Sequence, residues 1–256
     1  MLLTIDIGNT NITMGVYRGE TLAATWRIAT VHERMPDEYG ALLRQLLAIR
    51  GVDLSETTGV AIASVVPNLT NVFRQVSRVY LGQEPLVVDT GVRTGVRIRY
   101  ENPRDVGADR VVDCAAVQAK YGGPACVVDF GTATTFDAIS RDGEYLGGAI
   151  APGIGIAAEA LFSRASKLYR VEIAPPEKVI GTNTVMALQS GIFLGYVALV
   201  EGLVARFRRE LGDDMKVIAT GGLAETVSRE TPSIQIVDPW LTLDGLRIVY
   251  ELNRAA

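Results

Sequence analysis

The chain has 256 residues, of which 25 are basic and 29 acidic, so its formal net charge at neutral pH is −4. The hydrophobic share of 48% is enough to bury a sizeable core and excludes a disordered chain. The mild acidity argues against a nucleic-acid binder, and the presence of a single histidine, His32, excludes zinc sites built on several histidines.

Strand and helix patterns alternate along the chain. Short apolar runs bounded by turn residues predict strands over Leu2–Ile5, Val60–Val66, Leu86–Val88, Val96–Tyr100, Ala125–Val128, Tyr145–Ile150, Lys216–Ala219 and Ile234–Val237. Helical patterns between them predict helices over Tyr39–Ile49, Asn68–Tyr80, Arg110–Lys120, Gly155–Ser163, Asn183–Arg209 and Gly245–Asn253. This alternation predicts an α/β architecture with largely parallel sheets.

No segment of the sequence predicts export or a membrane anchor. The N-terminus runs from Met1 directly into a strand pattern, without a basic leader or a cleavage site. The longest apolar stretch, Gly191–Val204, is interrupted by Glu201 and is shorter than the roughly 20 residues that span a bilayer, so we predict a buried helix. Cys114 and Cys126 lie in apolar surroundings, as small core residues do. We expect a cytoplasmic protein with no membrane and no nucleic-acid partner.

A weak internal repeat relates the two halves of the chain. Residues 4–10 (TIDIGNT) resemble residues 127–133 (VVDFGTA), and each copy continues into another strand and a turn. Because the two copies are nearly half the chain apart, the repeat predicts two related lobes, residues 1–115 and residues 116–256, that face each other. Coincidence is the alternative, since an apolar-Asp-apolar-Gly sequence also ends ordinary strands.

The two repeated loops carry residue types that suit a phosphate site. Asp6 and Asp129 each end a buried strand, where a carboxylate can hold a hydrated cation. Gly8 and Gly131 let the backbone approach a phosphate that a Cβ would obstruct. Two such hairpins could grip a polyphosphate from both sides, and the sequence contains no Gly-x-x-x-x-Gly-Lys-Ser/Thr motif of the P-loop proteins.

A glycine-rich stretch offers a competing interpretation. Residues 153–158 (GIGIAA) follow a predicted strand and fit the looser form of the dinucleotide-binding fingerprint. Pro152 precedes them, and the fingerprint normally occupies the first strand-to-helix turn of its domain. A tight packing turn between strand and helix is therefore the favoured interpretation.

Residues 100–110 (YENPRDVGADR) form a predicted turn that leads into a helix. Asp109 lies near the start of that helix, where a carboxylate can simply cap the positive end of the dipole. The functional alternative is a base that takes a proton from a substrate hydroxyl, with Arg110 nearby to hold an anion. Asp113, four residues further on, either supports Asp109 or is a solvated charge.

Taken together and in order, these motifs closely resemble those of the type III pantothenate kinases over essentially the whole chain. The resemblance rests on residues 6–11 (DIGNTN), 101–103 (ENP), 107–110 (GADR), 129–135 (DFGTATT), 147–153 (GGAIAPG), 181–184 (GTNT) and 220–222 (TGG). It implies two duplicated actin-like (ribonuclease H-like) lobes with ATP in the cleft between them. It also implies transfer of the γ-phosphate of ATP to pantothenate, the first step of coenzyme A synthesis, by a homodimer.

The resemblance also implies roles for individual residues. Asp109 is the expected general base. The expected ATP-binding residues are Asp6, Gly8, Asn9, Thr10, Asn11, Thr13 and Thr132. The expected pantothenate contacts are Tyr100, Gly107, Ala108, Asp109, Arg110 and Thr184. Asp6 is expected to position Mg²⁺, directly or through water, and Asp129 to bind a monovalent cation, K⁺ or NH₄⁺.

Three other functions remain as alternatives. A non-catalytic ATP-binding regulator could use the same fold, because one fold serves many functions. Such a regulator would be expected to have lost an aspartate of the site, whereas Asp6, Asp109 and Asp129 are all present. A sugar or acetate kinase of the same superfamily and a dinucleotide-dependent oxidoreductase are the other two alternatives.

Overall fold

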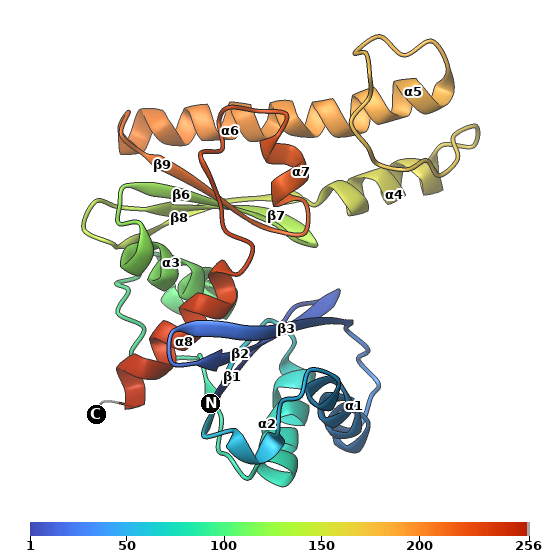
Figure 1. Ribbon diagram of the computed structural model, residues 1–256. Helices are drawn as coiled ribbons and strands as arrows, with labels where there is room; N and C mark the ends of the chain where they lie inside the picture. Colours follow the sequence, from blue (N-terminus) through green and yellow to red (C-terminus); the bar gives the residue numbers. More distant parts are fainter. Residues whose placement is uncertain (255–256) are drawn as a thin grey trace. The chain divides into compact units, whose positions relative to one another are not determined.

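A computed structural model describes residues 1–254, which form two compact units (Figure 1). Unit 1 contains Met1–Tyr121 and the segment that begins at Trp240, and unit 2 contains Gly122–Pro239. These units differ from the expected lobes 1–115 and 116–256 in two ways. The first boundary comes later because a helix continues to Lys120, and the last segment joins unit 1 because its helix packs on the sheet of that unit.

Unit 1 is built on a five-stranded sheet with helices on both faces. Its strands are β1 (Leu2–Ile7), β2 (Asn11–Arg18), β3 (Thr21–Ala29), β4 (Gly59–Ser64) and β5 (Leu86–Val87), and its longer helices are α1 (Pro36–Ile49), α2 (Pro67–Leu81), α3 (Ala108–Lys120) and α8 (Leu241–Arg254). Ile5 and Ile7 pack with α1 and α2 on one face. Ala63 packs with α3 and α8 on the other. Because side chains alternate along a strand, Asp6 belongs to the α3 and α8 face.

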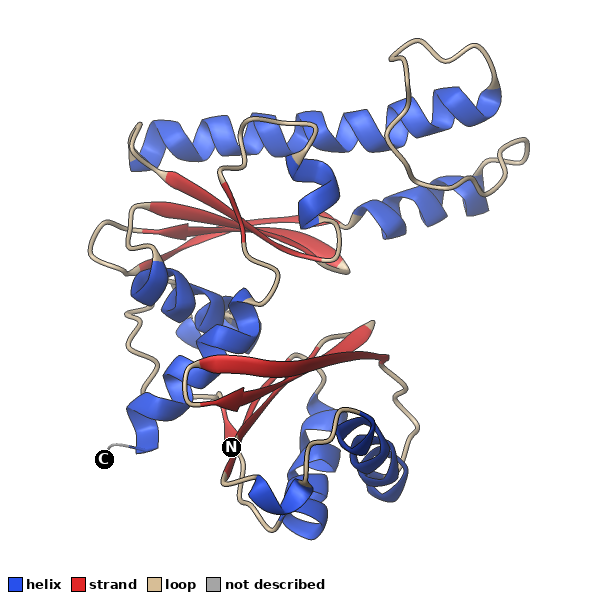
Figure 2. Cartoon of the chain, in the orientation of Figure 1, coloured by secondary structure: helices blue, strands red, loops and turns tan. Residues whose placement is uncertain are grey.

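Unit 2 is built on a second five-stranded sheet. Its strands are β6 (Ala125–Phe130), β7 (Ala133–Ile139), β8 (Tyr145–Pro152), β9 (Lys216–Gly221) and β10 (Ile236–Val237), and its helices are α4 (Ile154–Arg164), α5 (Thr184–Gln189), α6 (Gly195–Leu211) and α7 (Ala224–Ser228). The π-helical segment Ser190–Leu194 joins α5 and α6 into one long helix, as Figure 2 shows. Val200 and Val204 of this helix share a core with Cys126 and Val128 of β6.

The two sheets have the same topology. The strand order is β3-β2-β1-β4-β5 in unit 1 and, read in the matching direction, β8-β7-β6-β9-β10 in unit 2. In both sheets the first two strands are antiparallel, and the fourth strand of the unit lies parallel to the first. The internal repeat is therefore confirmed as a structural duplication, and each Asp–Gly loop follows the central strand of its sheet.

One predicted strand is wrong. Val96–Tyr100 forms no strand, and Ile98 makes only an isolated bridge. The segment alternates as a strand would, but Arg97 and Arg99 supply its exposed positions and the sheet of unit 1 ends at β5. A strand needs a hydrogen-bonding neighbour along its length, and the periodicity of the sequence contains no information about that neighbour.

The apolar stretch Gly191–Val204 lies within one long helix, close to the predicted bounds Asn183–Arg209. The continuous helix Thr184–Leu211 has 28 residues, and by length and composition alone it could cross a membrane, with 39% of its most apolar window buried inside the structure. Phe193, Val200 and Val204 of this helix lie in the core of unit 2. Core helices pass the same test of length and hydropathy, so this helix is weak evidence for a membrane span.

Candidate active site

The first phosphate loop, residues 8–10, connects β1 and β2. The Gly8 N–H donates to the carbonyl oxygen of Asn11 at 3.0 Å, and a Cβ on Gly8 would lie 3.0 Å from the same oxygen. This close approach favours glycine at the start of the loop. Asp6 pairs with Thr13 across the hairpin and both are half-buried. Asn9, Thr10 and Asn11 are exposed, so the loop offers its amides and side chains to a ligand.

The second phosphate loop, residues 131–132, connects β6 and β7 and is one residue shorter than the first. The Gly131 N–H donates to the carbonyl oxygen of Ala133 at 3.1 Å. Asp129 is half-buried, whereas Gly131 and Thr132 are exposed. The same local design, an aspartate one residue before the strand end followed by a glycine turn, therefore recurs in both units.

Asp129 lies against a strand end that the sequence did not connect with it. β9 is parallel to β6, and its last residue, Gly221, pairs with Phe130. Gly221 has φ = +88°, and a Cβ there would lie 2.4 Å from Oδ1 of Asp129. The absence of a side chain at Gly221 thus leaves room for the Asp129 carboxylate. Only the strand order reveals this contact.

Tyr196 of α6 is a second unpredicted neighbour of this loop. Its ring lies 6.2 Å from that of Phe130, and its hydroxyl is hydrogen-bonded to the hydroxyl of Thr134. Burial, with a smaller contribution from the charge of Asp129, raises the pKa of Tyr196 to about 12. Tyr196 lies two residues after the end of the π-helical segment Ser190–Leu194, and such segments occur frequently at functional sites. Sequence reasoning missed Tyr196, because helical periodicity does not reveal a π-helical irregularity.

Asp109 occupies the first turn of α3. Gly107 is the N-cap residue, and the Asp109 Oδ1 accepts a hydrogen bond from the backbone N–H of Arg110 at 2.8 Å. Burial raises the pKa of the Asp109 carboxyl, against the opposing effects of this hydrogen bond and of the Arg110 charge. A carboxylate with a raised pKa is a stronger base, which suits it to accept a proton from a hydroxyl.

Within unit 1, Asp109 lies near the end of the strand that carries the first loop. The Val65 N–H donates to the carbonyl oxygen of Ile7, the last residue of β1, at 3.1 Å. A Cβ on Gly107 would lie 3.5 Å from Cγ1 of Val65 and 2.4 Å from Oδ1 of Asp109. The absence of a side chain at Gly107 therefore leaves space for the Asp109 carboxylate beside the end of the central strands.

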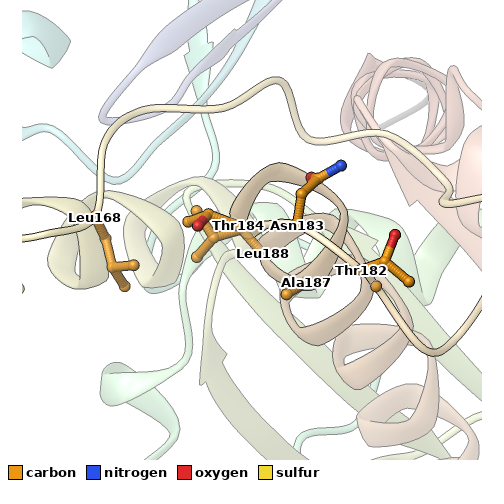
Figure 3. Close-up of a pocket in the computed structure, with 7 residues that line it drawn as sticks. Leu168, Thr182, Asn183, Thr184, Ala187 and Leu188 are labelled. Carbon is orange, nitrogen blue, oxygen red and sulfur yellow. The ribbon is translucent and has the colours of Figure 1, made fainter.

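The other predicted substrate residues divide between the units. In unit 1, Arg110 is buried and Tyr100 is 39% exposed. Asp113 is also buried, so the interpretation of Asp113 as a solvated charge is wrong. In unit 2, Thr184 lines an open pocket of about 440 Å³ (Figure 3). The other lining residues come from the first turn of α5 and from the segments before it: Leu168, Gly181, Thr182, Asn183, Ala187 and Leu188.

The fit to a magnesium nucleotide rests on Asp6. Among residues 1–254, no group of three or more histidine, cysteine, aspartate or glutamate side chains could hold a metal ion. Magnesium in phosphoryl-transfer sites is commonly held by one or two carboxylates together with the substrate phosphates. A single half-buried carboxylate at the end of β1, next to a loop of exposed amides, is compatible with that arrangement.

The duplicated sheets, each with an Asp–Gly loop after its central strand, define an α/β protein built from two actin-like units. A model of the family described as type III pantothenate kinase matches residues 2–206. The chain belongs to the type III pantothenate kinase family.

Curated relatives match along their full lengths. The "Type III pantothenate kinase" of Moorella thermoacetica is 57% identical over 253 residues, which cover 99% of this chain and 100% of the relative. The protein of the same name from Roseiflexus sp. strain RS-1 is 54% identical over 255 residues, which cover 100% of both chains.

Solved structures of lower identity share the fold. A Campylobacter jejuni protein assigned to the Baf family of transcriptional activators superposes with a TM-score of 0.64 at 19% identity, covering 99% of this chain and 100% of that one. The ethanolamine utilization protein EutJ of Carboxydothermus hydrogenoformans superposes with a TM-score of 0.54 at 17% identity, covering 96% and 89%. At such identities these likenesses concern the fold alone.

The glycines of residues 153–155 test the two interpretations of that motif. A Cβ on Gly153 would lie 2.3 Å from the carbonyl oxygen of Thr132 and 2.6 Å from that of Gly131, whereas a Cβ on Gly155 meets nothing within 4 Å. The Gly153 N–H also donates to the carbonyl oxygen of Thr132 at 3.1 Å. Gly153 therefore packs directly on the second phosphate loop, as the packing-turn interpretation predicts.

We expect Gly153→Ala to displace the second loop, with overpacking that costs about 1–3 kcal/mol and a higher KM for ATP. Gly155→Ala should leave activity unchanged and stabilise α4 by up to about 1 kcal/mol, because alanine is the better helix former. Thermal denaturation and steady-state kinetics of the two variants give the comparison. Equal behaviour of the two variants would contradict the packing argument.

Proposed function

We propose that this chain transfers the γ-phosphate of ATP to the primary hydroxyl of pantothenate, the first step of coenzyme A synthesis. Its membership of the type III pantothenate kinase family supports the reaction. The observation that carries the proposal is the position of Asp109, whose carboxylate shares the region beyond β1 and β4 with the first phosphate loop. The non-catalytic regulator is not favoured, since closely similar relatives of this chain are named as kinases.

Asp109 acts as the general base in this proposal. Its carboxylate accepts the proton of the pantothenate hydroxyl as that oxygen attacks the γ-phosphorus, the bond to the β-phosphate oxygen breaks, and ADP leaves. Gly107, Ala108 and Arg110 contact pantothenate beside the base, with further contacts from Tyr100 and Thr184. The burial that raises the pKa of Asp109 increases its basicity, while the hydrogen bond from the Arg110 N–H keeps the carboxylate oriented.

The phosphate loops hold the nucleotide in place. Asp6, Gly8, Asn9, Thr10, Asn11 and Thr13 bind phosphates from unit 1, and Thr132 contacts ATP from unit 2. Asp6 would hold Mg²⁺, directly or through water, and the ion would neutralise charge on the transferring phosphoryl group. Phosphoryl transfer depends mainly on alignment and charge neutralisation, so neither loop needs a reactive side chain. The interlobe cleft expected for ATP stays a prediction.

A monovalent cation, K⁺ or NH₄⁺, completes the proposed site at Asp129. The position of Asp129 supports this assignment, because Asp129 is the penultimate residue of the central strand of unit 2, as Asp6 is in unit 1, and Gly221 leaves room for its carboxylate. A bound cation would also supply the positive charge that a lysine supplies in other phosphate loops. We further propose that the enzyme works as a homodimer in the cytoplasm.

The proposal predicts pantothenate-dependent release of ADP from MgATP, at a higher rate in potassium than in sodium. Asp129→Ala should lose the dependence on potassium, whereas Asp213→Ala, at an exposed aspartate of the same unit, should retain it. A coupled ADP assay in the two salts measures both effects. If folded protein that binds ATP releases no ADP in either salt, a regulator or another acceptor is favoured. An unchanged potassium response of Asp129→Ala would assign the cation to another site.

A further inference from the structure

The segment after β3 makes contacts with the first phosphate loop that no feature of the sequence had indicated. Thr30 directly follows β3, and β3 pairs with β2 so that Ala29 lies opposite Asn11. The Thr30 hydroxyl donates to the carbonyl oxygen of Gly8 at 2.6 Å. The Thr30 backbone N–H donates to the carbonyl oxygen of Thr10 at 2.9 Å. One residue thus binds the first and the last carbonyl groups of the three-residue loop.

These hydrogen bonds determine which way the loop presents its amides. In a planar trans peptide the carbonyl and the following N–H point in opposite directions. Because the Gly8 carbonyl is directed at Thr30, the N–H of Asn9 is directed away from Thr30. Asn9 is exposed. An N–H held in this direction can donate to an anion, whereas a carbonyl turned the same way would repel it.

Thr30 is itself held by the core of unit 1. The next residue, Val31, donates its N–H to the Tyr39 hydroxyl at 3.1 Å, and the same hydroxyl donates to the Val31 carbonyl at 2.9 Å. Tyr39 belongs to α1 and is buried, and its ring packs against that of Phe73 with centroids 4.8 Å apart. The hydrogen bonds to the loop therefore come from a segment anchored on a rigid helix.

We propose that Thr30 is a positioning residue for the nucleotide phosphates, acting through its hydroxyl on the Gly8–Asn9 peptide. This inference rests on the proposed binding of ATP at the first loop. Thr30 contacts only the loop proposed to bind ATP and does not touch the reacting atoms. We therefore expect its loss to weaken nucleotide binding and to leave pantothenate binding unchanged. The hydroxyl is essential to the role, which means that serine can replace threonine and valine cannot.

The test compares Thr30→Val, which removes the hydroxyl at nearly constant volume, with Thr30→Ser, which keeps it. We expect Thr30→Val to raise the KM for MgATP about fivefold to tenfold, the effect of one lost hydrogen bond, with the KM for pantothenate unchanged. Thr30→Ser should stay within about twofold of the wild type. The control is Thr25→Val, the same change on β3 opposite Gly15, which should leave both KM values unchanged.

Equal increases in both KM values, or failure of Thr30→Ser to restore the KM for MgATP, would overturn the inference. Calorimetric titration with Mg²⁺ and the β,γ-imido analogue of ATP measures nucleotide binding without turnover. It therefore tests the role of Thr30 independently of the proposed function. Weaker binding by Thr30→Val alone supports the positioning role even if pantothenate is not the acceptor. Unchanged binding by Thr30→Val in a wild type that phosphorylates pantothenate overturns the role of Thr30 and leaves the function intact.

Discussion

Asp109→Asn is expected to reduce kcat by about 10²–10⁴-fold, the usual contribution of general-base catalysis, while the protein stays folded. The asparagine side chain keeps an oxygen that can accept the 2.8 Å hydrogen bond from the Arg110 N–H, so the first turn of α3 should persist. Coupled ADP release measures the rate, and circular dichroism verifies the fold. Normal turnover in folded Asp109→Asn would remove Asp109 from the mechanism.

The same variant should be more resistant to heat at neutral pH than the wild type. Burial raises the pKa of Asp109 in the folded chain, so the ionised carboxylate destabilises the folded state relative to the unfolded state. The stabilising contribution of a group with a raised pKa is fully present below the unfolded pKa and is lost as the pH rises through the folded pKa. The Tm advantage of Asp109→Asn should therefore be smallest at low pH and increase to a plateau above the raised pKa.

A matched control separates this effect from the general loss of an aspartate. Asp142 lies in an exposed turn of unit 2, and Asp142→Asn should change neither kcat nor the pH dependence of the Tm.

The raised pKa of Asp109 also predicts the direction in which activity changes with pH, since the base must be ionised to accept a proton. The kcat/KM of the wild type should rise with pH through the folded pKa of Asp109, and a Tm advantage largest at low pH would contradict the assignment.

Gly221→Ala is expected to damage both stability and activity through the second phosphate loop. The φ of +88° is strained for any residue with a Cβ, and the new methyl group would lie 2.4 Å from the Asp129 carboxylate and 2.7 Å from the backbone nitrogen and oxygen of Phe130. The conformation alone costs roughly 1–2 kcal/mol and overpacking typically adds about 1–3 kcal/mol. We expect a Tm lower by roughly 5–10 °C and loss of activation by potassium.

Gly122→Ala provides the control for backbone strain. Gly122 has φ = +70° in the same unit, but a Cβ there meets nothing within 4 Å. This variant should show only the conformational cost, with normal turnover and a normal response to potassium. If both variants lose activity equally, strain in unit 2 explains the loss and the contact between Gly221 and Asp129 does not.

The two phosphate loops could be recognised without a structure because they depend on local chemistry. An apolar strand, an aspartate, a glycine and a return strand are all adjacent in sequence, and their repetition near Asp6 and Asp129 indicated the duplication. The matching strand orders confirm that prediction. Periodicity was less informative at Val96–Tyr100, where an alternating segment lacks a neighbouring strand and remains irregular.

The amino-acid sequence by itself determined the α/β class, the duplicated units, the family and the residues that make up the two loops. The tertiary structure alone decided what surrounds those loops and Asp109: Val65 beside the Gly107–Asp109 turn, Gly221 and Tyr196 beside Asp129, and Thr30 behind Gly8. The reason is physical. Turn geometry and side-chain alternation depend on adjacent residues, whereas strands that neighbour each other without being consecutive bring distant segments together, and only the folded sheet specifies those neighbours.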